Sequence, residues 1–214
     1  MRVFLMIVGI FVLGMNSAYA DDSTRYRASI TNLTKGQVMT PPVVVVHRKS
    51  FALFTLGEEA SEGLKRQARD GDPSLLTGEL ETADGVINFT VGDGVILPGE
   101  TQEIEFSGSP TDQFSVSSML ASTNDAFVAR PGLPLNPAVI EKGVVLLHVY
   151  DAGAEVNDEL CAHIPGPPCG NPGVDTDDNE GFVHFHPGLH LQGDLDQSHT
   201  FANIAARIII ERIK

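Results

Sequence analysis

The 214-residue chain is long enough for one domain with a sizeable core. It carries 28 Asp and Glu against 14 Lys and Arg, which gives a formal net charge of −14 at pH 7. This acidic balance argues against nucleic acid as a partner, because binding to phosphates needs clustered cations. The surplus carboxylates can instead attract divalent cations, although an acidic surface that only favours solubility is the commoner meaning.

Residues 1–20 are typical of a secretory signal peptide. Arg2 precedes an apolar stretch over residues 4–12, and Ala18-Tyr19-Ala20 fits the small-x-small pattern of a cleavage site. The apolar stretch is short for a membrane-spanning helix, and no later segment is long enough to be a transmembrane anchor. We therefore expect residues 21–214 to form a single exported domain, either periplasmic or extracellular.

Alternating apolar and polar residues are the main local signal after the cleavage site. Residues 26–31 and 103–106 alternate with a period of two, which is typical of half-buried strands. Five further runs are rich in β-formers and bounded by Pro, Gly, Asn or Asp: 43–47, 86–91, 114–119, 144–150 and 206–213. Many short strands in this rhythm predict an all-β fold, an antiparallel β-sandwich.

One or two short helices are expected around residues 59–78. Ala60, Leu64 and Ala68 recur at helical spacing, and Gly71 is a natural end point. Asp72-Pro73 can begin a second helical turn, because Asp accepts hydrogen bonds from free amides and Pro suits the first turn.

The two cysteines, Cys161 and Cys169, lie in a Pro- and Gly-rich stretch, CAHIPGPPC. In an oxidising compartment we expect them to form a disulfide bond, because a reactive thiol would tend to oxidise after export. The surrounding segment, residues 154–178, is long enough to be a functional loop.

Three histidines occur within the segment EGFVHFHPGLHLQGD. His184 and His186 lie on the same side if this segment is extended, and Pro187-Gly188 can turn the chain to bring His190 near them. Such a trio can bind zinc or copper, with Glu180 as a further ligand or hydrogen-bond acceptor. The alternative is a loop whose histidines bond to the backbone or face solvent.

Common catalytic motifs are missing from the sequence. It contains no nucleophile elbow, phosphate-binding loop or zinc-protease helix. We therefore expect a protein that is not an enzyme.

Several segments together resemble the spondin N-terminal domain family. They are YRASITNLTKGQVMTPPVVVVH, LFTLGEEASEGL, STNDAFVAR, VYDAGAEVND and IAARIIIERI, and they span nearly all of the chain after residue 20. The resemblance implies an antiparallel β-sandwich similar to calcium-dependent lipid-binding domains. It also implies a divalent-cation site for calcium at one end of the sandwich.

The resemblance assigns three carboxylates to this site: Glu105, Asp125 and Asp151. The first match can slip to Glu103, which alternation places on the same face of the strand. Calcium takes six to eight hard oxygens, so Asn124, Glu155, backbone carbonyls or waters would complete the shell; magnesium would retain more waters.

These observations predict an exported, calcium-binding adhesion or interaction module of the spondin type, with an unidentified extracellular or envelope ligand. Two alternatives remain open. One is a zinc or copper protein that uses His184, His186 and His190. The other is a purely structural envelope protein in which calcium only holds loops together.

Overall fold

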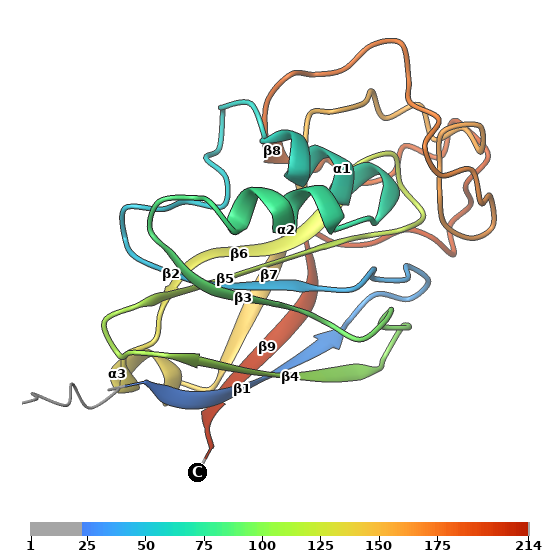
Figure 1. The fold of residues 1–214 in the computed structure, drawn as a ribbon. Coiled ribbons are helices and arrows are strands. Elements are labelled where there is room, and N and C mark those ends of the chain that lie inside the picture. The colour runs from blue at the N-terminus through green and yellow to red at the C-terminus, as the bar shows by residue number, and fades with distance from the viewer. Residues whose placement is uncertain (1–22, 214) are drawn as a thin grey trace, which may run out of the picture.

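The structure is a computed structural model, and it describes residues 23–213. The predicted signal peptide, residues 1–20, lies outside the described residues. Within residues 23–213, nine strands and three short helices form the fold (Figure 1). The strands are β1 Thr24–Asn32, β2 Val43–His47, β3 Val86–Val91, β4 Thr101–Gly108, β5 Gln113–Met119, β6 Ala126–Pro134, β7 Val144–Asp151, β8 His184–Phe185 and β9 Ile204–Arg212. The helices are α1 Glu62–Asp70, α2 Ser74–Leu80 and α3 Pro137–Ile140.

The strands form one antiparallel sheet in the order β3-β2-β5-β6-β7-β9-β1-β4, with β8 paired to β7. The sheet curls into a nearly closed barrel, so its two edge strands come side by side. Asn88 of β3 donates its side-chain amide to the carbonyl of Ser107 in β4 at 2.9 Å. The prediction of antiparallel β structure is confirmed, but the strands belong to one curled sheet and not to two separate sheets.

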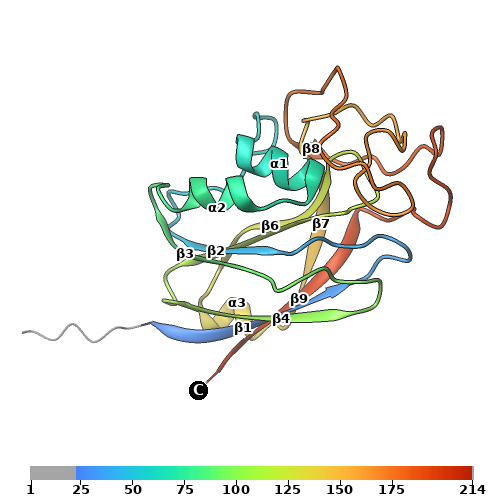
Figure 2. The same ribbon diagram turned by 45° about the vertical axis from the view of Figure 1, so that its right-hand side comes forward.

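The alternation of the strands produces two apolar cores. Inward-facing residues such as Ile30, Phe114 and Ile208 fill the barrel. On the outer face of β2, β5 and β6, residues such as Val45 and Phe127 pack beneath α1 and α2. Figure 2 shows both helices lying over that side of the sheet.

The two helices at 59–78 are confirmed. Ser61 caps α1 by accepting a hydrogen bond from the Leu64 amide at 3.2 Å, and Gly71 ends it with φ of 70°. Asp72 accepts a hydrogen bond from the Ser74 amide at 2.9 Å, at the beginning of α2. The helices pack so closely that a Cβ on Gly63 would lie 2.5 Å from the Leu76 Cα.

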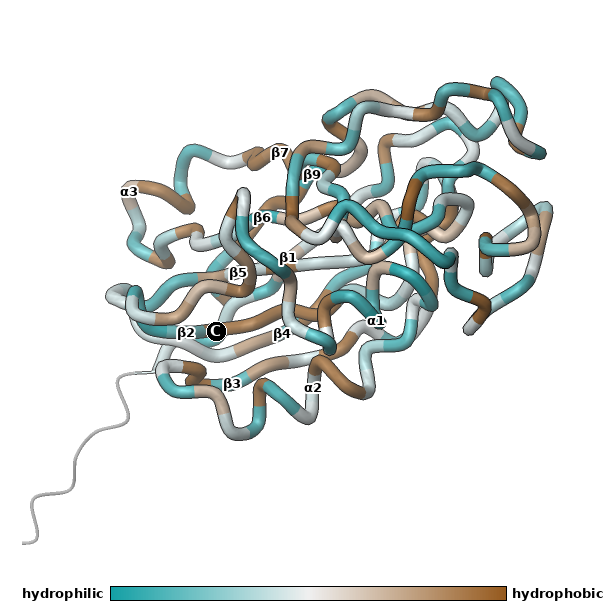
Figure 3. The backbone as a smooth tube through the Cα atoms, turned by 90° about the horizontal axis from the view of Figure 1, so that it is seen from above, coloured by the Kyte–Doolittle hydropathy of each residue, from teal (hydrophilic) through white to brown (hydrophobic). Residues whose placement is uncertain are grey.

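Residues 152–203 separate β7 from β9, and within them the described chain forms only the two-residue strand β8. This long loop gathers at one end of the barrel, in orange and red at the top of Figure 1. Seen from above, hydrophobic segments concentrate along the strands, whereas the loop carries many hydrophilic stretches (Figure 3). The start of β1 and the end of β9 lie at the other end of the barrel, where Tyr26 pairs with Arg212.

Candidate metal centre

Strand pairing brings three predicted site residues to the loop end of the barrel. β6 starts immediately after Asp125 and β7 ends at Asp151, and Ala126 pairs with Asp151 across the two antiparallel strands. β8 then adds His184 directly opposite Asp151. Residues far apart in the sequence therefore meet because they lie at adjacent strand ends.

Asp151, Glu180 and His184 form a group whose potential ligand atoms all lie within 4.8 Å of one another. The His184 Nε2 atom lies 3.6 Å from the Asp151 Oδ1 atom. The Asp151 side chain is fully buried, whereas 27% of the His184 side chain is exposed. The group is thus open to solvent on one side, and it could hold a metal ion.

Asp125 lies beside this group and is fully buried. Its Oδ2 atom accepts hydrogen bonds from the backbone amides of Ala154 at 2.6 Å and Glu155 at 3.1 Å, but its buried Oδ1 atom has no partner among the described residues. Burial, together with the charges of Asp151 and Glu180, raises the pKa of Asp125 well above its usual range. This carboxylate is therefore electrostatically destabilised.

Glu180 shows the same features. Its Oε2 atom is buried and has no hydrogen-bond partner in the described part of the chain. Burial, followed by the charge of Asp151, raises the Glu180 pKa. Three carboxyl groups that repel one another, two of them with an unpaired buried oxygen, fit a cation, because positive charge would both satisfy these oxygens and relieve the repulsion.

The three histidines predicted as a metal site have separate roles. His184 belongs to the carboxylate group, and the His186 Nε2 atom lies 4.0 Å from the Asp151 Oδ2 atom. His190 is more exposed, and its ring lies 3.7 Å from Glu159. The structure therefore does not gather the three rings around one point, because the chain turns at Pro187-Gly188 toward Glu159.

Glu105 lies on another part of the barrel. Its exposed carboxylate pairs with Arg25 at 2.5 Å and Arg27 at 3.1 Å, and hydrogen bonding to Arg27 is the main cause of its lowered pKa. Strands β9 and β1 separate β4 from β7, and the register pairs Glu105 with Arg27 near the end of the barrel that lies away from Asp151. The neighbouring Glu103 also faces Arg27, at 3.4 Å.

Buried acids also organise the long loop around the site. The Glu155 Oε1 atom accepts a hydrogen bond from the Thr176 amide at 3.0 Å, while its buried Oε2 atom has no partner among residues 23–213. Burial raises the pKa of Glu155 to about 7. Glu159 accepts hydrogen bonds from the backbone amides of His190 and Gln192.

Asn124 and the cysteine pair hold the loop as well. The Asn124 side chain accepts a hydrogen bond from the Glu159 amide at 3.1 Å and donates one to Asp158 at 3.0 Å, so it ties the loop to the start of β6. The predicted Cys161–Cys169 disulfide is confirmed, with 4.8 Å between the two Cα atoms.

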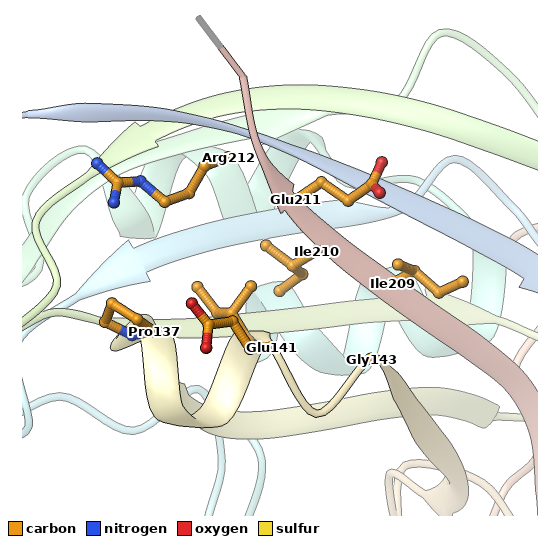
Figure 4. A pocket seen from close by; sticks show the side chains of 8 residues that line it. Pro137, Glu141, Gly143, Ile209, Ile210, Glu211 and Arg212 are labelled. Carbon is orange, nitrogen blue, oxygen red and sulfur yellow. The ribbon is translucent and has the colours of Figure 1, made fainter.

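A separate apolar pocket of about 350 Å³ lies between α3 and the end of β9 (Figure 4). It is lined by Pro137, Ile140, Glu141, Gly143 and Ile209–Arg212. Ile209 pairs with Val144 at the start of β7, whereas Asp151 ends that strand, so the pocket and the carboxylate group lie at opposite ends of the barrel.

Comparison with known proteins gives no match to this chain, either among protein-family models or among curated proteins. Among the described residues, no helix has the length and apolar character needed to cross a membrane. The functional argument therefore depends on the site itself.

Proposed function

We propose that the protein is an exported, non-enzymatic interaction module of the spondin type, in which a divalent cation organises the loops at one end of the β domain. The observation that carries this proposal is the group of Asp151, Glu180 and His184. Asp125 lies beside it, and one buried oxygen of Asp125 and one of Glu180 are unpaired among the described residues. The disulfide supports export, because such bonds persist in oxidising compartments.

The resemblance to spondin domains, and through them to calcium-dependent lipid-binding sandwiches, is part of this proposal. It assigned Asp125 and Asp151 to one cation site, and the two residues do lie at adjacent strand ends. Calcium is the cation that the resemblance implies. Calcium outside the cytoplasm can be abundant enough to fill even a weak carboxylate site. The partner would be an extracellular or envelope ligand that recognises the cation-ordered loops.

Calorimetry and thermal melting of chelator-treated protein test the cation site. We expect calcium or another divalent cation to bind and to raise the melting temperature, because an ion that binds only the folded state stabilises it. Asp125→Asn and Asp151→Asn should each weaken binding at least about tenfold, since each removes a charge beside the ion.

Glu105→Gln is the matched control, because this acid lies in exposed ion pairs with Arg25 and Arg27. It should bind the cation as the unaltered protein does. A protein that binds no divalent cation at millimolar concentration contradicts the proposal. Weaker binding by Glu105→Gln, with unchanged binding by the other variants, would mean that Glu105 is a ligand, as the resemblance implies.

A transition-metal protein is the second candidate, and His184 specifically favours it. An imidazole nitrogen within 4.8 Å of oxygens from two carboxylates suits manganese, zinc or copper better than calcium, which prefers oxygen ligands. Elemental analysis of protein purified without a histidine tag tests this function. A stoichiometric transition metal supports it, and only trace amounts of all of them contradict it.

A further inference from the structure

Asn157 links two of the candidate ligands. Its side-chain nitrogen Nδ2 donates a hydrogen bond to the Asp151 Oδ2 atom at 2.6 Å and a longer one to the Glu180 Oε1 atom at 3.4 Å. One amide group therefore holds one oxygen from each of two carboxylates that would otherwise repel each other. Of the second oxygens, Asp151 Oδ1 accepts one hydrogen bond from the Gly153 backbone amide at 2.8 Å and keeps a lone pair for another partner. Glu180 Oε2 has no partner among the described residues.

His186 determines which way this amide faces. The Gly188 backbone amide lies 2.9 Å from the His186 Nδ1 atom, and because an amide can only donate, Nδ1 must accept. The proton of the neutral ring is then on Nε2, which donates to the Asn157 Oδ1 atom at 3.0 Å. With its oxygen bonded to His186, Asn157 must present its nitrogen to the carboxylates.

This hydrogen-bond chain also excludes His186 as a ligand in the observed arrangement. Both ring nitrogens are already used, and the side chain is fully buried. Burial lowers the pKa of His186 to about 4, in agreement with a ring that stays neutral. The hydrogen-bonded link from His186 to Asp151 therefore runs through Asn157.

We propose that Asn157, oriented by His186, is a positioning residue that sets the ion selectivity of the carboxylate group. By holding Asp151 Oδ2 and Glu180 Oε1, it fixes how both carboxylates are turned and favours binding of an ion through the other oxygen of each. Asp125 is restricted in the same way, because two backbone amides occupy its Oδ2 atom.

The resulting donor set favours a small ion over calcium. It consists of single carboxylate oxygens and the His184 nitrogen, which suits the four to six ligands of zinc or manganese. Calcium takes six to eight oxygens and gains from bidentate carboxylates, which the Asn157 hydrogen bonds disfavour. This inference rests on the proposed cation site and names the class of ion that the site selects.

Competitive titration with Mn²⁺, Zn²⁺ and Ca²⁺ tests the inference on the chelator-treated protein, without a histidine tag. The unaltered protein should bind Mn²⁺ or Zn²⁺ more tightly than Ca²⁺. Asn157→Leu, which has a similar size but no donor, should lose about 10- to 100-fold in affinity for the small ions, the usual effect of removing a group that orients a ligand. Its affinity for Ca²⁺ should fall much less, so the selectivity ratio should drop.

A pair of variants at His186 tests the orienting role independently of Asn157→Leu. His186→Leu should lower the selectivity ratio of the small ions over Ca²⁺, as Asn157→Leu does. His186→Gln keeps a side-chain N–H donor and should retain most of that selectivity. Nitrogen NMR of the unaltered protein should find His186 Nδ1 without a proton and Nε2 with one, both before and after the ion is added. A protonated Nδ1 overturns the hydrogen-bond chain whether or not an ion binds.

The results separate this inference from the proposed function. Cation binding with the same selectivity ratio in Asn157→Leu and the unaltered protein contradicts the inference and leaves the cation site intact. Tighter binding of Ca²⁺ than of either small ion by the unaltered protein contradicts it too. A protein that binds none of the three ions contradicts both.

Discussion

At the scale of single residues, Glu155 makes the stability of the metal-free protein depend on pH. Its pKa is raised from 4.5 to about 7, so the folded state disfavours its charged form. The stabilisation that Glu155 contributes is therefore fully present below pH 4.5 and is lost as the pH rises through about 7.

Replacing Glu155 by Gln should remove this dependence. In chelator, Glu155→Gln should match the unaltered protein at pH 5 and exceed its free energy of unfolding at pH 8. The expected gain is on the order of 1 kcal/mol, a value discounted for the partly solvated loop around the carboxylate. Denaturant unfolding at the two pH values measures the difference, and an equal effect of the substitution at both would show that burial does not shift this carboxyl group.

The sequence predicted some of the site residues but not how they combine. Asp125 and Asp151 were predicted together, and β6 and β7 place them at neighbouring strand ends. His184 lies opposite Asp151 because β8 pairs with β7, and β8 has only two residues, too few to leave a periodic signal in the sequence. Glu105 looked like a strand-end acid, and its pairing with Arg25 and Arg27 depends on a strand register that local sequence does not specify.

At the scale of elements, two glycines in helices provide a matched test of packing. Gly63 in α1 contacts the backbone of α2, where an added Cβ would lie 2.5 Å from the Leu76 Cα. Gly78 in α2 has no atom within 4 Å of the same position. Their different surroundings should reverse the effect of the same substitution.

Gly78→Ala should stabilise the protein by about 0.5–1 kcal/mol, because alanine is the better helix former. Gly63→Ala should destabilise it by roughly 1–3 kcal/mol, because the helix pair must move apart. Thermal melting of both variants measures the contrast. A gain in stability from Gly63→Ala would mean that α1 and α2 are packed less closely than the structure shows.

Most elements were predictable, and the ones that were missed have physical reasons. Helices α1 and α2 were expected from their helical spacing and end signals, and seven strands from alternation or β-rich composition. Strand β6 was not expected, because Pro131, Gly132 and Pro134 interrupt its second half. Helix α3 has only four residues, which is too short for a recognisable period.

At the scale of the whole molecule, the cation site and the long loop should be stabilised together. Residues 153–203 contribute Glu180 and His184 to the site, and the backbone of Ala154 and Glu155 bonds to Asp125. Without a cation, repulsion among the carboxylates favours opening of this loop before the barrel unfolds.

Limited proteolysis in chelator should therefore cut first within residues 153–203, and a saturating cation should slow this cleavage severalfold. Asp125→Asn should abolish most of the protection, whereas Glu105→Gln should preserve it. If a protein shown to bind the cation is cleaved at equal rates with and without it, cation binding does not stabilise the loop.

The overall architecture could be predicted only in part. Alternation established antiparallel β structure, because it reports which face of each strand is buried. Whether the strands form one curled sheet or two depends on pairings between distant strands, such as β1 with both β4 and β9, and these leave no local mark.

The long loop and the two ends of the described chain lie at opposite ends of the barrel, which has a practical and a biological consequence. β1 alone extends over roughly 30 Å between them, given its nine residues. A surface, a resin or a neighbouring domain attached at residue 23 or 213 would therefore hold the carboxylate group outward, toward whatever approaches from solution. Tethering by either end leaves the cation site free, so a sensor coated with end-anchored protein can be used directly to search for the ligand.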